Sequence, residues 1–380
     1  MHPETDQPLR ILHAVRAPVG GIMRHILDVA NGQIERGHQV GIVTDSLTGG
    51  ERAREWLGEI APRLTLGIHR FPIQREPHAA DVLTWLHFKS LIKRLNPNVL
   101  HGHGAKAGAF LRMRRRPAKT IRVYTPHGGS LHFPRGTLKG EIYGRLERAL
   151  MNQTELFLFE SGFARATYQR MIGTPGGLVN CVFNGVTPPE FDPINPADDA
   201  TDLVYVGEFR KIKGADLLID ALAELHADGR ALTLTLAGDG EETDALRAQI
   251  EQKGLSDWVR FIGHVQARYG FSKGRLLIVP SRGDSMPYVV IEAAAAGIPM
   301  IAAGVGGIPE IFGPHSDGLF QPATATAMAE AIRSAIDDPE KTAARAEALR
   351  QRIAEHFSQK TMVEGVIAGY REAFTEQKGR

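Results

Sequence analysis

The chain has 380 residues, of which 43% are hydrophobic and 23% charged, a composition typical of a globular protein with enough chain for two domains. Its single cysteine, Cys181, excludes an intrachain disulfide and fits a reducing cytoplasm. The N-terminal MHPETDQPLR lacks the apolar segment of a signal peptide, and no run is apolar enough to span a bilayer. We therefore expect a cytoplasmic protein.

Charge is distributed unevenly along the chain. Residues 1–190 contain 25 Lys and Arg against 15 Asp and Glu, whereas residues 191–380 contain 20 against 28. The basic half is expected to meet something anionic. Its densest patch, RMRRRPAK at 112–119, is either a solvated helix end or a contact with an anionic membrane surface. Nucleic acid is not expected as a partner, because no recognition motif or aromatic interleaving accompanies the charge.

Short β-branched runs alternate with amphipathic segments along the whole chain. In the first half, strands are predicted at 10–15, 39–44, 96–101, 120–125, 156–159 and 178–183, with helices that include 22–36 and 82–95. In the second half, strands are predicted at 202–207, 232–238, 259–263, 275–280 and 298–303, with helices at 216–225, 241–253, 288–296 and 361–376. This alternation predicts two parallel sheets with helices on both faces.

A proline-rich acidic stretch, Asn184 to Ala200, separates the halves. The predicted organisation is an N-terminal domain at 1–188, a linker at 189–200, a second domain at 201–359 and a C-terminal helical segment at 360–380.

Several motifs of the first half lie where a strand meets a helix. Gly20 and Gly21 allow a ligand to approach the backbone at a helix N-terminus. The glycines of VLHGHGAKAG resemble a dinucleotide fingerprint, but the spacing differs and no acidic residue follows for a ribose, which disfavours NAD. His101 and His103 have no Cys, Asp or Glu nearby, so a metal site is not expected. His127 ends a strand in PHGG and is either a ligand contact or an ordinary loop histidine.

Basic residues follow the first strand of the second half. In VGEFRKIKG, the residues Arg210, Lys211 and Lys213 precede a helix whose dipole disfavours cations, so a shared phosphate would explain their placement. A solvated loop is the alternative. Gly238 ends the next strand in AGDG and leaves room for a ligand.

The stretch GDSMPYVVIEAAAAGIPM contains two acidic residues, Asp284 and Glu292. Ser285 or Met286 is the expected N-cap, and Gly297 the expected C-terminal residue, of an apolar helix in which Glu292 would be buried. A buried carboxylate needs partners, and the two hydroxyls of a sugar suit it. A structural salt bridge is the alternative. Eight residues of helix would separate the two acids by about 12 Å, which is too far for both to act on one bond.

The order of these motifs resembles the family 4 retaining glycosyltransferases of GT-B fold, of the bacterial surface-polysaccharide type. The block SRGDSMPYVVIEAAAAGIPMIAAGVGGIPEI, from Ser281 to Ile311, is the most specific part, and the resemblance covers nearly the whole chain. It implies two Rossmann-like domains facing a central cleft. The second domain would bind a UDP- or GDP-sugar, the first a saccharide or lipid-linked acceptor, and the last helix would cross back onto the first domain. Neither a cofactor nor a metal is implied.

The resemblance also implies roles for individual residues. Glu292 matches the acid that holds the ribose, Lys213 binds the diphosphate, and His264 and Val265 frame the base. The expected catalytic residues are His127, Asp284, Arg210 and Lys213. The other expected donor contacts are Gly20, Gly21, Asn184, Gly207, Gly238, Ser285, Met286, Tyr288 and Val289, and the expected acceptor contacts are Lys106 and His127.

The chain departs from the family pattern at three positions. Asp284 stands where a glutamate is usual, which shortens the reach to the sugar by one methylene. Glu208 occupies the place of the diphosphate arginine, so Arg210 is expected to supply that charge. Pro287 replaces a common glycine and removes one amide from the phosphate cradle.

The expected function is a metal-independent, retaining hexosyl transfer in cell-envelope polysaccharide synthesis, with peripheral attachment to the inner face of the membrane. A nucleotide-sugar epimerase of the same fold is the first alternative, and it would need no acceptor. The second alternative is a non-catalytic module that binds a nucleotide and turns nothing over.

Overall fold

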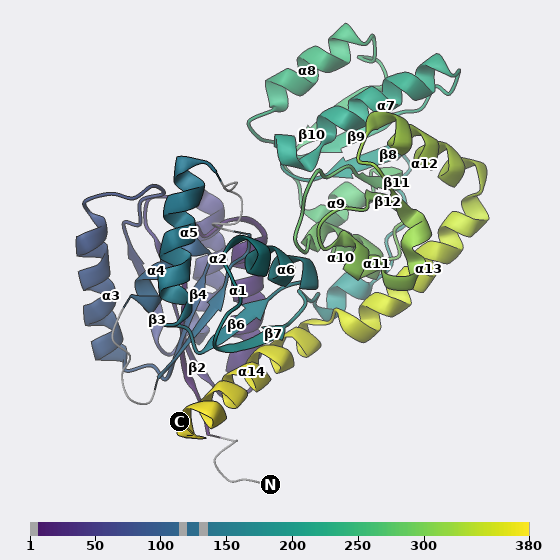
Figure 1. The fold of residues 1–380 in the computed structure, drawn as a ribbon. Coiled ribbons are helices and arrows are strands. Elements are labelled where there is room, and N and C mark those ends of the chain that lie inside the picture. Colours follow the sequence, from purple (N-terminus) through teal and green to yellow (C-terminus); the bar gives the residue numbers. More distant parts are fainter. Residues whose placement is uncertain (1–6, 114–119, 129–135, 380) are drawn as a thin grey trace. The chain divides into compact units, whose positions relative to one another are not determined.

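The computed structural model of the chain describes residues 7–113, 120–128 and 136–379. It consists of two compact units, each a parallel sheet covered by helices (Figure 1). Unit 1 combines residues 1–184 with residues 359–380, and unit 2 comprises residues 185–358. The units therefore divide at Asn184 and at Ser358, close to the ends of the predicted domains. The basic patch predicted at 112–119 lies largely outside the described residues.

Unit 1 has a sheet of seven strands in the order β3-β2-β1-β4-β5-β6-β7. Its strands are β1 (Arg10–Val15), β2 (Gln39–Asp45), β3 (Gly67–Phe71), β4 (Val99–His103), β5 (Ile121–Thr125), β6 (Leu156–Phe159) and β7 (Leu178–Cys181). Its helices are α1 (Gly20–Glu35), α2 (Gly50–Ile60), α3 (Asp81–Leu95), α4 (Ala105–Arg112), α5 (Leu138–Met151), α6 (Gly162–Met171) and α14 (Gln359–Gly379).

Unit 2 has a sheet of six strands in the order β10-β9-β8-β11-β12-β13. Its strands are β8 (Thr201–Val206), β9 (Leu234–Ala237), β10 (Val259–Gly263), β11 (Gly274–Val279), β12 (Met300–Ala303) and β13 (Leu319–Phe320). Its helices are α7 (Ala215–Ala227), α8 (Thr243–Gln252), α9 (Ala267–Phe271), α10 (Tyr288–Ala295), α11 (Ile308–Phe312), α12 (Ala325–Asp337) and α13 (Pro339–His356).

Every strand pairing between named strands is parallel. In both sheets the order along the sheet reverses beside the first strand, between β1 and β4 in unit 1 and between β8 and β11 in unit 2. Ligands of open parallel sheets bind outside the carboxyl ends of the strands at such a reversal. The topology thus indicates one candidate ligand edge in each unit.

The strands are buried because apolar side chains cover both faces of each sheet. In unit 2, Leu218 and Leu222 of α7 pack with Met328 of α12 against the sheet. In unit 1, α14 (yellow in Figure 1) inserts Val366 and Tyr370 into the same core as Ile11 of β1. The C-terminal helix therefore completes the core of unit 1.

The alternation of strands and helices agrees with the predicted fold class, with local differences. The predictions omitted β3 and β13. The helix α10 begins at Tyr288 with Pro287 as its N-cap, not with Ser285 or Met286. Asp284 therefore precedes the helix, and the separation of about 12 Å, which assumed eight helical residues, does not apply. Gly297 follows the helix with a φ of +73°, as predicted for a C-terminal glycine.

None of the described helices combines the length and the apolar character needed to cross a bilayer.

Candidate active site

The predicted donor residues of unit 2 gather at the carboxyl ends of its strands. Arg210 and Lys213 follow β8, Gly238 follows β9, His264 follows β10, and Asp284 follows β11. Because parallel strands end at one edge of the sheet, these loops share the ligand edge predicted by the topology.

An ion pair joins two of these loops at the reversal of strand order. The Lys213 Nζ donates to Asp284 Oδ2 at 2.7 Å, and the hydroxyl of Ser281 donates to the same oxygen at 3.2 Å. The side chains of Lys213 and Asp284 are 27% and 15% exposed. The pair is thus partly screened by protein and remains within reach of a ligand.

A second set of charged contacts joins the same two loops. Asp216, in the first turn of α7, accepts two hydrogen bonds from Arg282 at 2.7 Å each and one from Lys211 at 2.6 Å. Burial opposes ionisation of Asp216, but the hydrogen bonds from Arg282 and Lys211 outweigh it and lower its pKa to about 2. Neither Asp216 nor Arg282 was predicted from the sequence as a site residue.

Glycines allow the loops to pack this closely. A Cβ on Gly238 would lie 1.9 Å from the carbonyl oxygen of Gly207, and one on Gly306 would lie 1.6 Å from that of Asp284. Gly306 also has a φ of +63°, a backbone conformation that residues with a side chain rarely adopt. The predicted ligand glycine Gly238 therefore has a packing role independent of any ligand.

Glu292 is less buried than the sequence predicted. It is of intermediate exposure, whereas Ile291 and Ala293 beside it are fully buried. The apolar residues cover most of α10, but the side of the helix that carries Glu292 is reached by solvent. A carboxylate in this position can exchange its contacts for ligand hydroxyls without a full desolvation cost.

The remaining predicted residues of unit 2 surround this centre unevenly. Arg210 is 48% exposed, and its guanidinium is 3.7 Å from the Glu208 carboxylate. Met286 and Tyr288 are buried, whereas Ser285, Val289 and Val265 are of intermediate exposure and His264 is exposed. A cationic loop and the N-terminus of α10 therefore occur on the same edge of the sheet.

In unit 1, His127 lies in a cluster of histidines at the reversal between β1 and β4. Its Nε2 is 3.0 Å from Nδ1 of His103, whose Nε2 is 2.9 Å from Nδ1 of His13. Asn184, predicted as a donor contact, belongs to this unit, where its Oδ1 is 3.0 Å from Nδ1 of His25. Gly20 begins α1 with open space around its Cα, and Gly21 follows it in the first turn.

Lys106, the predicted acceptor contact, is already engaged. Its Nζ is 2.9 Å from Asp81 Oδ1 and donates to the carbonyl of Glu76 at 2.6 Å. In the free protein this lysine ties α4 to the first residue of α3 and to the segment before it.

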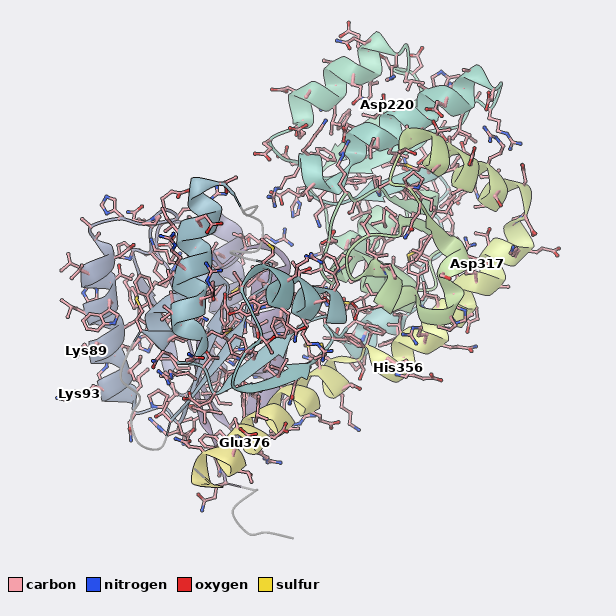
Figure 2. All side chains as sticks on the ribbon, in the orientation of Figure 1. Lys89, Lys93, Asp220, Asp317, His356 and Glu376 are labelled. Atoms are coloured by element: carbon pink, nitrogen blue, oxygen red, sulfur yellow. The ribbon has the colours of Figure 1, made fainter. Side chains whose placement is uncertain are left out.

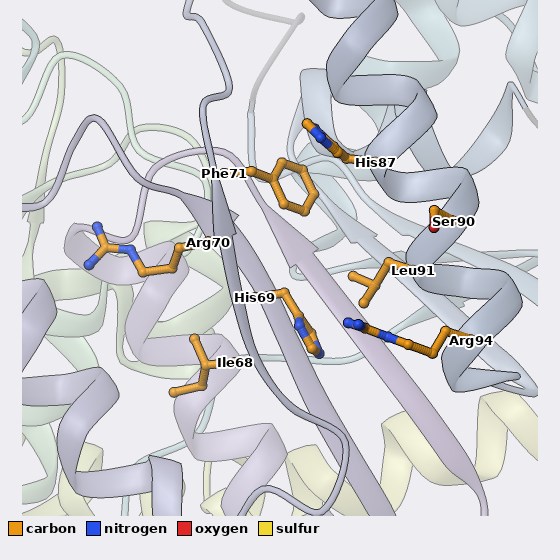
Figure 3. Close-up of a pocket in the computed structure, with 8 residues that line it drawn as sticks. All are labelled: Ile68, His69, Arg70, Phe71, His87, Ser90, Leu91 and Arg94. Carbon is orange, nitrogen blue, oxygen red and sulfur yellow. The ribbon is translucent and has the colours of Figure 1, made fainter.

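Two cavities open on unit 1. One, of about 340 Å³, lies at the carboxyl ends of β1 and β2 and is lined by Arg16, Thr48 and Arg75 among others. Burial and the proximity of Arg75 lower the pKa of Arg16. The other, of about 510 Å³, lies between β3 and α3, where Figure 3 shows the Arg94 side chain extending toward His69. The first cavity is at the ligand edge, and the second is at the outer edge of the sheet.

Comparisons with known proteins agree with this architecture. The model of Glycosyltransferase Family 4 matches residues 19–189, and that of Glycosyl transferases group 1 matches residues 187–352. The glycogen synthase of Mycobacterium tuberculosis is 24% identical over 380 residues, which cover 93% of this chain and 91% of that protein. The gpi3 subunit of the phosphatidylinositol N-acetylglucosaminyltransferase of Schizosaccharomyces pombe is 25% identical over 331 residues, covering 84% and 70%.

A solved structure has the same fold. Anabaena Alr3699/HepE, crystallised with UDP-glucose, superimposes with a TM-score of 0.80 at 20% identity, covering 96% of this chain and all of that one. Two Rossmann-like units with their ligand edges at the strand reversals have the GT-B fold. The two family models together account for residues 19–352, and the chain belongs to the family 4 glycosyltransferases.

Proposed function

We propose that this glycosyltransferase moves a sugar, with retention of anomeric configuration and without a metal ion, from a nucleoside-diphosphate sugar to a saccharide or lipid-linked acceptor. The observation that carries the proposal is the Lys213–Asp284 ion pair at the strand reversal of unit 2, beside the helix that presents Glu292. The UDP-glucose complex of a protein with the same fold supports a nucleotide-sugar donor.

The donor would lie on the ligand edge of unit 2. Glu292 accepts hydrogen bonds from the ribose hydroxyls, which an ionised carboxylate suits. The diphosphate contacts Lys213, Arg210 and the first amides of α10, because a helix N-terminus favours negative charge. Asp284 and His127 orient the transferred sugar. His264 and Val265 frame the base, and the other predicted donor residues of unit 2 lie on the same edge, whereas Gly20, Gly21 and Asn184 belong to unit 1.

Transfer in this site would rest on electrostatic stabilisation of the leaving group. The bond between the anomeric carbon and the diphosphate oxygen breaks, and its electron pair passes to the diphosphate. The acceptor oxygen bonds to the anomeric carbon on the same face, and its proton passes to a diphosphate oxygen. Lys213 and Arg210 supply the positive charge for which other transferases use a metal ion.

The acceptor would bind to unit 1 through its cavity at the ligand edge. The Arg16 guanidinium makes no hydrogen bond or ion pair with the described residues, although the Arg16 carbonyl accepts from the Asp45 amide; Arg75 and Asp45 line the same cavity. Because the two arginines repel one another, the cavity favours binding of an anionic group of the acceptor. An acceptor linked to a lipid diphosphate carries such a group, and a relative that acts in phosphatidylinositol glycosylation is consistent with it.

Helix α3 provides a surface for peripheral attachment to an anionic membrane. Val82, Leu83 and Leu86 are 63%, 62% and 45% exposed, which is unusual for large apolar side chains that gather on one helix. Lys89 and Lys93 extend from the same helix in Figure 2. Exposed apolar and basic residues together favour the surface of an anionic bilayer.

The donor site is tested by thermal stabilisation with UDP, GDP, ADP and NAD. A ligand at about 100 times its dissociation constant adds about 2.7 kcal/mol to stability. We expect one nucleoside diphosphate to stabilise the wild type and not the Glu292→Ala variant. Stabilisation by NAD alone, or by none of the four, would contradict the proposal.

Transfer itself is tested with radiolabelled UDP- and GDP-sugars in EDTA. Labelled product should form when a lipid extract or an oligosaccharide mixture is added. Conversion of the nucleotide-sugar to its epimer without any acceptor would indicate an epimerase. Binding of the nucleotide-sugar without turnover would indicate a non-catalytic module. Activity that depends on added metal would refute metal independence.

Membrane attachment is tested by sedimentation with phosphatidylglycerol vesicles. Salt-sensitive binding should weaken in Lys93→Glu and persist in Lys360→Glu, which changes another exposed lysine of a unit 1 helix. Equal binding by the two variants would contradict the role of α3.

A further inference from the structure

Five histidines converge inside unit 1, although they come from four places in the chain. Strand β1 contributes one, α1 one, β4 two and the loop after β5 one; they are His13, His25, His101, His103 and His127. Neighbouring ring centroids are 4.0–5.7 Å apart. The proposed function uses only His127, which leaves four histidines without an assigned role.

Burial keeps these side chains uncharged. It lowers the pKa of His13 and of His25 to about 4, and it lowers the pKa of His103 and His127 well below the ordinary value. Neutral imidazole is the form of histidine that binds metal ions.

Hydrogen bonds to neighbouring amides fix the tautomers. Asn184 Oδ1 accepts from Nδ1 of His25, at 3.0 Å, so Nε2 of His25 carries no proton. Gln33 Oε1 accepts from Nε2 of His13 at 2.9 Å. The Nδ1 of His13 is then an acceptor for Nε2 of His103 at 2.9 Å, and Nδ1 of His103 carries no proton.

These partners resemble the outer shell of a metal site. A ligating histidine usually donates its other ring N–H to a carbonyl or a comparable acceptor, which orients the ring. His25 has such a partner in Asn184, and His103 has one in His13, which is itself held by Gln33. Nε2 of His25 and Nδ1 of His103, which carry no proton, are thus oriented by hydrogen bonds that the other nitrogen of each ring makes.

A third nitrogen lies within reach of both. The Nε2 of His127 is 3.0 Å from Nδ1 of His103, and the ligand atoms of His25, His103 and His127 are all within 4.8 Å of one another. Nitrogens 3.0 Å apart subtend an angle of about 94° at an ion about 2.05 Å from each, so this pair has to open slightly to reach the tetrahedral angle of about 109°. The third ligand atom lies at most 4.8 Å from the other two and has to approach to the separation of about 3.3 Å that a tetrahedral site requires.

We propose that His25, His103 and His127 form a binding site for a first-row transition-metal ion such as Zn²⁺, with Nε2 of His25, Nδ1 of His103 and Nε2 of His127 as ligand atoms. In the free protein, the His127 Nε2–H donates to His103 and occupies the position of the ion. On binding, this proton moves to Nδ1 of the same ring, and the protein releases no proton. His127 is half-buried, which leaves the site accessible from solvent.

A second set of three histidines, His13, His101 and His103, is also compact enough for an ion. Both ring nitrogens of His101 are engaged there, with the hydroxyls of Tyr370 at 2.7 Å and Thr125 at 2.9 Å. Both nitrogens of His13 are engaged as well. An ion at this set would break two or more buried hydrogen bonds, so the first set is favoured.

The test uses the full-length protein without an affinity tag, after treatment with EDTA. Calorimetric titration with Zn²⁺ and visible absorption with Co²⁺ should show one ion per chain. The heat should be the same in two buffers of different ionisation enthalpy, because no proton is released. The Gln substitutions His25→Gln, His103→Gln and His127→Gln should each weaken binding about tenfold or more.

Two further variants make the test specific. Asn184→Ala keeps all three ligands and should weaken binding about tenfold through the orientation of His25. His69→Gln removes a histidine of unit 1 outside the cluster and should bind as the wild type does. Melting curves without metal identify any variant that fails to fold. Absence of binding by wild type, unchanged affinity in His25→Gln, or loss in His101→Gln without loss in His25→Gln would overturn the proposal.

Discussion

Lys213 and Asp284 are 71 positions apart in sequence, and the Lys213 ammonium donates to the Asp284 carboxylate at 2.7 Å. The ammonium proposed to hold a diphosphate is therefore neutralised by the carboxylate proposed to orient the sugar. A bound diphosphate would compete with Asp284 for Lys213 and would also be repelled by Asp284.

The first prediction separates these two effects. Asp284→Asn should bind the nucleoside diphosphate about three to ten times more tightly, because the ammonium is released and the repulsion removed. Turnover should fall in the same variant. Lys213→Met should weaken diphosphate binding about tenfold or more. Calorimetry with the diphosphate measures both constants.

Weaker binding by Asp284→Asn would show that the carboxylate supports the loop more than it opposes the ligand. Lys253→Met, which removes an exposed lysine paired with Asp220 in the same unit, is the control and should bind as wild type does.

The second prediction concerns Glu292 and the ribose. Glu292→Gln should lose about tenfold to a hundredfold in affinity for the nucleoside diphosphate, because hydrogen bonds to a charged group contribute about 1.5–3 kcal/mol. A 2′,3′-dideoxy diphosphate should bind wild type and variant equally. Competition with a fluorescent nucleotide measures all four constants.

Glu330→Gln removes an exposed acid of α12 and should change neither constant. An equal loss of both ligands in Glu292→Gln would place the effect in the structure of α10 and not in the ribose contact.

The third prediction concerns the contact between Asp216 and Arg282. Asp216→Asn removes the charge that holds Lys211 and Arg282, and it should destabilise unit 2 by about 1–3 kcal/mol. Because the loops after β8 and β11 then lose a common anchor, diphosphate affinity should fall as well. Denaturant unfolding gives the first quantity and calorimetry the second. If Asp216→Asn is destabilised but its diphosphate affinity is unchanged, the contact between Asp216 and Arg282 stabilises unit 2 without positioning the ligand site.

The amino-acid sequence was sufficient for the parallel α/β class and for placing most of the predicted donor residues of unit 2 at the carboxyl ends of strands. In unit 2, the hydrophobic patterns typical of strands and of helices alternate along the chain, and Lys213 and Asp284 each follow a recognisable strand. The strand β3, GIHRF, escaped prediction because it has five residues and no β-branched run. The strand β13 has only two residues.

The contacts that depend on strand order were not predictable from the sequence. His13 was read as part of a strand and His25 as part of a helix, and His101 and His103 were judged to lack companions. The cluster forms because β1 pairs with β4, which is not the next strand in the chain. The pairing of Asp216 with Arg282 likewise depends on β8 lying beside β11. The exposure of Glu292 was misjudged because an apolar helix predicts burial on all sides, and α10 is covered on most but not all of them.

The fourth prediction joins the metal site to the proposed transfer. A Zn²⁺ ion on His127 would compete with the sugar for the same imidazole, so Zn²⁺ should inhibit wild-type transfer. The concentration for half inhibition should rise about tenfold or more in His25→Gln, which leaves His127 in place. Initial rates in a zinc-buffered series measure both values. Equal inhibition of wild type and His25→Gln would show that Zn²⁺ acts elsewhere.

The fifth prediction follows from the low pKa values of the buried histidines. His13 and His25 have folded-state pKa values of about 4 and unfolded values near 6.5, so the unfolded state binds more protons between these limits. Stability therefore rises with pH in this window: it is fully present above about 6.5 and is lost as the pH falls toward 4. Each of the two contributes about 2 kcal/mol to the difference between pH 7 and pH 5. Urea unfolding in EDTA should show this loss of stability in unit 1. The variant His13→Gln should lose less stability, and the reduction should be about half of what His13 and His25 contribute together. Stability that is flat between pH 7 and pH 5 would contradict the low folded-state pKa values of His13 and His25.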